Sequence, residues 1–148
     1  MILVKNTQRK IPINIERLKK DAQKVLALLD YADYDLGIWI TTNATIQQYN
    51  ATYRGKSKPT DILSFPFHAD LQAGDRIEPA SPEEKNLGDL IISAEYVAGM
   101  LEECEMTLDE RMRVLLVHGI CHLLGYDHIT DEEFIEMERH ENYLLSRL

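Results

Sequence analysis

The chain has 148 residues, of which 45% are hydrophobic and 28% are charged, a composition typical of one folded domain rather than of a disordered chain. The first residues lack the long apolar stretch of a signal peptide, and no apolar run approaches a membrane span, so the sequence predicts a cytoplasmic protein without a membrane segment. The net charge of −9, taken alone, disfavours a polyanionic partner, and Cys104 and Cys121 are too few for a disulfide framework or a four-cysteine zinc site.

Strands and helices alternate in the first half of the chain. Short runs of β-branched and aromatic residues predict strands, and apolar residues at helical spacing predict helices between them. Pro66 cannot donate a ladder hydrogen bond, so its strand should lie at a sheet edge or end there, beside a cleft. The predicted elements are strands at residues 2–5, 36–41 and 61–67, and helices at residues 13–29 and from 42 or 43 to about 53.

The second half of the chain opens with a long polar segment, residues 68–86, that has no clear period and predicts a mobile loop able to act as a flap. A strand at 87–93 follows, and Ser93 can cap a helix that runs to about Cys104. Capping boxes at Thr107 with Glu110 and at Thr130 with Glu133 predict two further helices, the second reaching Leu148. The pattern indicates one α+β domain over residues 1–148.

The most informative segment is V-H-G-I-C-H-L-L-G-Y-D-H, residues 117–128, at the end of a predicted helix. His118 and His122 are four residues apart, so both imidazoles project from one helix face and can bind the same cation. Gly125 can adopt the left-handed conformation that ends a helix, which lets the chain turn back and bring His128 to the ion. Three neutral imidazoles with an open fourth position are typical of catalytic zinc, which lowers the pKa of its water to about 7. The segment predicts one Zn²⁺ per chain, held by these three histidines.

Neighbouring residues qualify this interpretation. Metzincin proteases share the spacing but place a glutamate general base after the first histidine, where this chain has Gly119, so peptide hydrolysis is disfavoured. Cys121 is a competing ligand, although core packing is the preferred interpretation. Asp127 either orients a ligand imidazole or caps the turn. His68 and His140 are expected to be solvated side chains outside the site.

A basic loop formed by Arg54, Lys56 and Lys58 precedes the third strand. Arg54 can bind a scissile phosphate through its planar charged guanidinium, with the two lysines as point charges for the flanking backbone, although such clusters are commonly just solvated loops. Residues 1–65 carry ten basic and six acidic residues, a net charge of +4, whereas residues 66–148 carry six and nineteen, a net charge of −13. Either the basic half faces RNA or the acidic half only keeps the protein soluble.

Three blocks carry a resemblance to a known family: Y-R-G-K-S-K-P-T-D-I-L-S-F-P-F at 53–67, L-G-D-L-I-I-S at 87–93 and H-G-I-C-H-L-L-G-Y-D-H at 118–128. With these blocks the chain resembles the YbeY family of bacterial endoribonucleases, also called rRNA maturation factors. Their order and spacing extend the resemblance over nearly the whole chain.

The resemblance implies a single-strand-specific, metal-dependent endoribonuclease that helps to mature the 3′ end of 16S rRNA, takes part in ribosome quality control, and contacts small-subunit components and a ribosome-associated GTPase. It implies a zincin-like α+β fold with a mixed four-stranded sheet and about five helices. The family's zinc ligands map onto His118, His122 and His128, and its important arginine maps onto Arg54. Cys121 stands where members commonly have leucine, which keeps the cysteine-ligand alternative open.

Three functional hypotheses follow. In the first, zinc-bound water attacks a phosphodiester, or the ion polarises a phosphoryl oxygen, while Arg54 offsets the charge gained at phosphorus. The general base stays open between Asp127 and a phosphate oxygen of the RNA. The second hypothesis is a ribosome assembly factor that is stabilised by its metal and has little chemistry of its own, and the third and least favoured is a hydrolase of peptides or small molecules.

Overall fold

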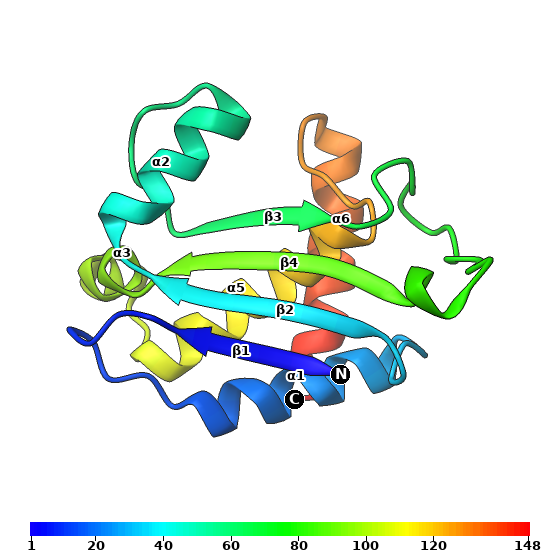
Figure 1. Ribbon diagram of the computed structural model, residues 1–148, viewed down its shortest axis with the longest axis horizontal. Coiled ribbons are helices and arrows are strands. Elements are labelled where there is room, and N and C mark those ends of the chain that lie inside the picture. Colours follow the sequence, from blue (N-terminus) through cyan, green and yellow to red (C-terminus); the bar gives the residue numbers. More distant parts are fainter.

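A mixed four-stranded sheet forms the centre of the computed structural model, which describes residues 1–148. Its strands are β1 (Ile2–Asn6), β2 (Asp35–Thr41), β3 (Ile62–Pro66) and β4 (Asn86–Ser93), and their order across the sheet is β1-β2-β4-β3. The first three strands in this order run parallel, and β3 runs antiparallel to β4 at the edge (Figure 1). All four predicted strands are confirmed within one or two residues. Pro66 is the last residue of the edge strand, as its missing N–H requires.

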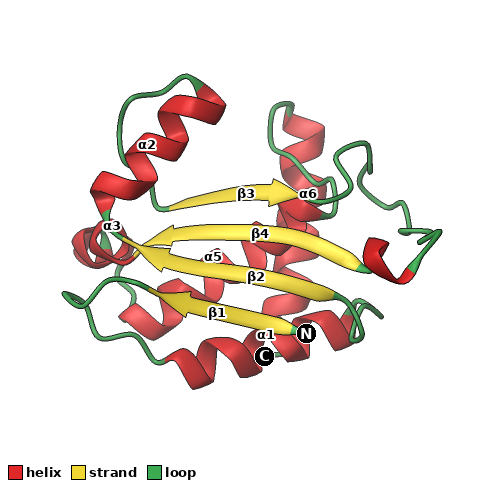
Figure 2. Cartoon of the chain, viewed as in Figure 1, coloured by secondary structure: helices red, strands yellow, loops and turns green.

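The chain also forms six α-helices and one short 3-10 helix, and most of the helical residues lie on one side of the sheet (Figure 2). The prediction of about five helices is confirmed, and the sixth arises because the segment expected to form one helix up to Cys104 is broken after Gly99, a residue that disfavours a helix interior. The first helix begins at Ile15 rather than 13 because the Asn14 side chain accepts the N–H of Arg17 and caps it. Both predicted capping boxes are present. The helices are α1 (Ile15–Leu28), α2 (Asn43–Arg54), α3 (Ala94–Gly99), α4 (Leu101–Cys104), α5 (Leu108–Leu123) and α6 (Asp131–Ser146), with η1 at Pro82–Glu84.

The main core lies between one face of the sheet and helices α1, α5 and α6. Alternation along the strands decides the two faces: Ile38 and Leu90 point into this core, whereas Trp39 and Ile91, one residue further, point to the opposite face. There α2 covers only part of the sheet, around a small cluster that includes Ile46. Part of this second face is therefore open to solvent. None of the helices is long and apolar enough to cross a membrane.

The polar segment 68–86 is mostly irregular, as predicted, and residues at its middle contact the core. Ile77 is 8% exposed, and its N–H donates to the Tyr31 hydroxyl at 3.1 Å. The Arg76 guanidinium donates to the Leu29 carbonyl at 2.8 Å and lies over the Tyr31 ring. The buried Ile77 therefore attaches the middle of this loop to the core, a contact that the loop's polar composition does not reveal.

Candidate metal centre and its cleft

Three imidazoles converge at the C-terminal end of α5. His118 and His122 lie one turn apart on this helix, and His128 lies in the loop that follows it. One ring nitrogen from each histidine lies within 4.8 Å of the other two, and the Nε2 atoms of His118 and His122 are 3.0 Å apart. Two nitrogens that are each about 2.05 Å from one tetrahedral ion lie about 3.3 Å apart. The three nitrogens are therefore close enough together to bind one metal ion.

The end of α5 is shaped by Gly125, which has a φ of 93°. Its N–H donates to the His122 carbonyl and the N–H of Tyr126 donates to the Cys121 carbonyl, both at 3.1 Å. This pair of bonds is the usual left-handed termination of a helix. It reverses the chain, which allows His128 to return toward the other two imidazoles.

We expect Gly125→Ala to destabilise the metal-free protein by about 1–3 kcal/mol. An alanine would have to keep a left-handed conformation, and its Cβ would press against the Leu71 carbonyl oxygen. Urea unfolding in the presence of a chelator measures the loss. Gly99→Ala is the control because nothing lies near a Cβ at that helical position, and equal stability of the two variants would contradict the prediction.

Hydrogen bonds fix how the imidazoles on α5 present their nitrogens. Nδ1 of His122 donates to the Tyr126 carbonyl at 2.9 Å, which leaves Nε2 as a lone pair in the neutral ring. Nδ1 of His118 bonds Glu141 Oε2 at 2.9 Å, which likewise directs its Nε2 to the site. Two lone pairs that face each other at 3.0 Å repel unless a cation lies between them, so the donor set fits a metal. Burial, and secondarily the neighbouring His118, lowers the pKa of His122, which favours the neutral ligand form.

Sequence reasoning missed Glu141, which lies on α6, 23 residues from His118. Helical spacing could have revealed it, because Glu141 lies on the buried face of α6 between Met137 and Leu144, and a charged residue on a buried face needs a partner. A carboxylate behind a ligand histidine fixes the ring and strengthens the nitrogen donor.

We expect Glu141→Ala to lower zinc affinity about 10- to 100-fold, because His118 loses the group that orients its ring. Glu141→Gln, which can still accept from Nδ1, should lose less. Competition of each protein with a zinc-binding dye measures the affinities. The control is Glu138→Gln on the exposed side of α6, and wild-type affinity in Glu141→Ala would exclude this role.

A cleft of about 780 Å³ joins the three histidines to the edge strand β3 and the end of α2. Arg54, the last residue of α2, lines this cleft and forms no hydrogen bond or ion pair within the protein. Lys56 and Lys58 are exposed in the loop beyond and do not line it. Asp127 does line it, and its Oδ1 accepts the N–H of His128 at 2.8 Å, so its observed contact caps the turn rather than orienting an imidazole.

The remaining candidates lie outside the cluster. Cys121 is fully buried in the main core, and burial raises the pKa of its thiol far above the usual range, which agrees with the packing role. His68 and His140 are not simply solvated, contrary to expectation. His68 Nε2 bonds the Glu84 carbonyl at 2.7 Å. The His140 ring is half-buried and stacks on Tyr126 with ring centroids 4.5 Å apart, because α6 packs against the turn after α5.

Position 119 explains why the chain carries no metzincin glutamate. Gly119 is buried where α5 packs on the sheet, and a Cβ there would lie 2.8 Å from the terminal methyl carbons of Ile62 and Leu90. A glutamate would overpack this contact and bury its charge. The close approach of helix and sheet therefore excludes the usual proton acceptor of that protease class.

Converging imidazoles and an unpaired arginine in one cleft are typical of metal-dependent hydrolases. Residues 3–148 match the family model described as Endoribonuclease YbeY. Endoribonuclease YbeY of Homo sapiens is 38% identical over 147 residues, which cover 99% of this chain and 87% of the human protein. Endoribonuclease YbeY of Aquifex aeolicus is 38% identical over 148 residues, which cover 99% of this chain and 91% of that protein.

A solved structure shares the fold. The solution structure of a Thermotoga maritima protein superposes with a TM-score of 0.60 at 21% sequence identity, covering 99% of this chain and 90% of that one. The chain belongs to the endoribonuclease YbeY family, and its class is that of a hydrolytic nuclease.

Proposed function

We propose that this protein is a single-strand-specific, metal-dependent endoribonuclease that acts in the 3′-end maturation of 16S rRNA and in ribosome quality control. The observation that carries the metal-dependent chemistry is the convergence of three ring nitrogens in the cleft that Arg54 also lines. The ribosomal role, with contacts to small-subunit components and a ribosome-associated GTPase, rests on the family resemblance. Zn²⁺, one per chain, is the proposed cofactor.

Each residue has a distinct task in this proposal. His118, His122 and His128 hold the ion, and the first two keep their protons on Nδ1 through Glu141 and the Tyr126 carbonyl. When bound, zinc supplies a Lewis acid and lowers the pKa of a bound water to about 7. Arg54 binds the non-bridging oxygens of the phosphodiester and offsets the negative charge that builds up on them as the bond to phosphorus forms.

The wall of the cleft supports a single-stranded substrate. Tyr53 is 64% exposed there, and Phe65 lies partly exposed across from it, with ring centroids 5.1 Å apart. Unpaired bases can stack on such rings, whereas the bases of a duplex are already stacked on each other. The same wall comes from residues 1–65, the half of the chain with a net charge of +4, which suits a polyanion.

Metal removal tests the function directly. A chelator should abolish cleavage of a single-stranded fragment that spans the 16S rRNA 3′ end, and one equivalent of Zn²⁺ should restore it. The matched control is the same RNA annealed to its complement, which should stay intact. Undiminished cleavage in chelator would contradict metal dependence, and a zinc-loaded protein that cuts no RNA would favour the assembly-factor hypothesis.

A further inference from the structure

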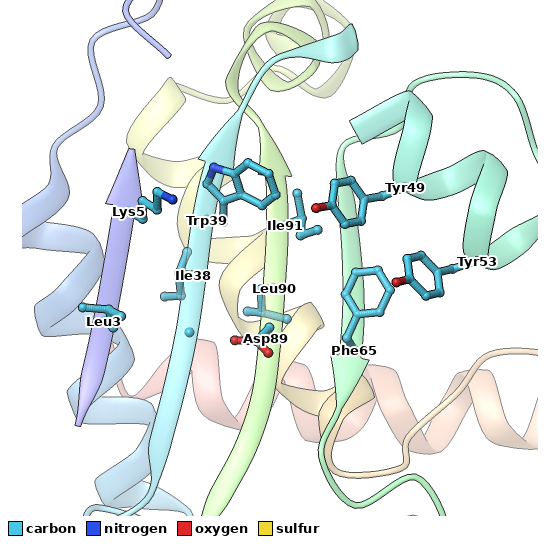
Figure 3. Close-up of a pocket in the computed structure, with 11 residues that line it drawn as sticks. Leu3, Lys5, Ile38, Trp39, Tyr49, Tyr53, Phe65, Asp89, Leu90 and Ile91 are labelled. Carbon is cyan, nitrogen blue, oxygen red and sulfur yellow. The ribbon is translucent and has the colours of Figure 1, made fainter. Parts of the chain in front are cut away.

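The open face of the sheet carries a second hollow of about 600 Å³, separate from the metal cluster. Figure 3 shows Trp39, Ile91 and Phe65 on the sheet face that α2 flanks, with Tyr49 and Tyr53 reaching over from that helix. Trp39 on β2 and Phe65 on β3 complete the aromatic part of the lining. We call these four residues the aromatic strip.

Strand register explains why the strip exists. Lys5 pairs with Trp39 and Trp39 with Ile91, while Gly37 pairs with Asp89 and Asp89 with Phe65, so alternation puts all of these side chains on one face. Only the Ile91 region is covered by α2, in the small cluster with Ile46. Trp39 and Phe65 pack beside this cluster and stay partly exposed, and Lys5 and Asp89 are exposed.

The four rings follow one another without a gap. Ring centroids are 5.5 Å apart for Trp39 and Tyr49, 6.1 Å for Tyr49 and Tyr53, and 5.1 Å for Tyr53 and Phe65. The Trp39 indole N–H donates to the Thr7 hydroxyl at 2.8 Å, which fixes that ring. Packing α2 against the sheet does not require a contiguous row of partly exposed rings. Such an exposed apolar patch is typical of a binding surface.

The strip runs into the metal cleft, because Tyr53 and Phe65 line both hollows and Arg54 follows Tyr53 directly. We propose that the aromatic strip is a stacking track for the bases of single-stranded RNA that extends from the cleaved phosphodiester. This inference rests on the proposed function and names the surface that binds the substrate beyond the cleft. Aromatic rings bind successive bases with little sequence preference, since every base has a π-face.

The charges around the strip favour bases inward and phosphates outward. Lys5 and Asp89 are the only charged residues that line the hollow, and the Asp89 carboxylate is exposed and forms no ion pair or hydrogen bond. An unpaired carboxylate repels phosphate but accepts hydrogen bonds from base amino groups. Arg54, Lys56 and Lys58 lie where α2 ends, next to Tyr53, and can meet the backbone there.

Trp39 is the only tryptophan of the chain, so its fluorescence reports on the strip directly. The probes are 2′-O-methyl RNA oligonucleotides of about four and about ten nucleotides, titrated into the zinc-loaded protein. The longer probe should quench Trp39 and bind more tightly. Tyr49→Leu, which keeps an apolar side chain, should weaken the longer probe about tenfold and leave the shorter one nearly unchanged. Tyr143→Leu, at a 48% exposed tyrosine on α6, is the control and should match wild type.

The outcomes separate this inference from the proposed function. RNA that is cut normally but leaves Trp39 fluorescence unchanged, with Tyr49→Leu equal to wild type for both lengths, would overturn the stacking track and leave the nuclease intact. Quenching and length dependence without any cleavage would support the track while the proposed function fails.

Discussion

Replacing His122 with alanine is expected to abolish zinc binding and RNA cleavage together. His122 is the central imidazole of the cluster, since its Nε2 lies 3.0 Å from that of His118 and its ring packs edge-on against both other imidazoles. Two ligands hold the ion far more weakly than three. Losing about 4 kcal/mol of transition-state stabilisation by the Lewis acid corresponds to a roughly thousand-fold lower rate. Elemental analysis of the purified variant and single-turnover cleavage of single-stranded rRNA measure the two effects.

Thermal unfolding adds a readout that does not depend on activity. Zinc at a hundred times its dissociation constant should stabilise the wild-type protein by about 2.7 kcal/mol, and this gain should vanish in His122→Ala. Without metal, the variant should be about as stable as the wild type, because the substitution removes the repulsion between the Nε2 lone pairs of His118 and His122. His68→Ala removes a histidine outside the cluster and should keep both zinc and cleavage. A His122→Ala protein that retains one zinc per chain would contradict the role of His122 as a zinc ligand.

The convergence of the imidazoles was predictable because each step is local. Helical periodicity places His118 and His122 on one face, and the left-handed Gly125 fixes where the chain turns back toward His128. The strands were predictable for a similar reason, since alternating burial and the position of Pro66 depend on a few consecutive residues.

What the sequence did not reveal depends on packing between distant elements. Glu141 meets His118 only because α6 lies against α5, and nothing near the histidine motif encodes that contact. The anchoring of segment 68–86 depends on Ile77 finding the core beside Tyr31, which its polar neighbours conceal. The separation of Arg54 from Lys56 and Lys58 follows from Gly55, whose left-handed conformation ends α2 and directs the following loop away from the cleft. The spacing of the charges in the sequence predicted a single basic group of these three residues.

Arg54→Ala is expected to keep zinc and lose catalysis. The side chain is exposed and forms no hydrogen bond or ion pair, so stability should change by no more than about 0.5 kcal/mol and the zinc content should stay at the wild-type level. Cleavage of single-stranded rRNA should fall about 100- to 1,000-fold, the usual loss when a donor that stabilises developing charge is removed. Single-turnover rates and elemental analysis on the same preparation measure both quantities.

Two companion variants make the result specific to the guanidinium group. Arg54→Lys keeps the charge but not the planar pair of donors, so it should recover only part of the rate. Lys58→Ala removes a charge outside the cleft and should weaken RNA binding modestly, with a shallower salt dependence and little change in the rate of the bound complex. An Arg54→Ala protein that cuts RNA at the wild-type rate would remove the arginine from the mechanism. Arg54→Ala could also be inactive in vitro yet restore ribosome maturation in a deletion strain. That result would favour the metal-stabilised assembly factor over the nuclease, because the variant keeps its zinc and its fold and lacks only the chemistry.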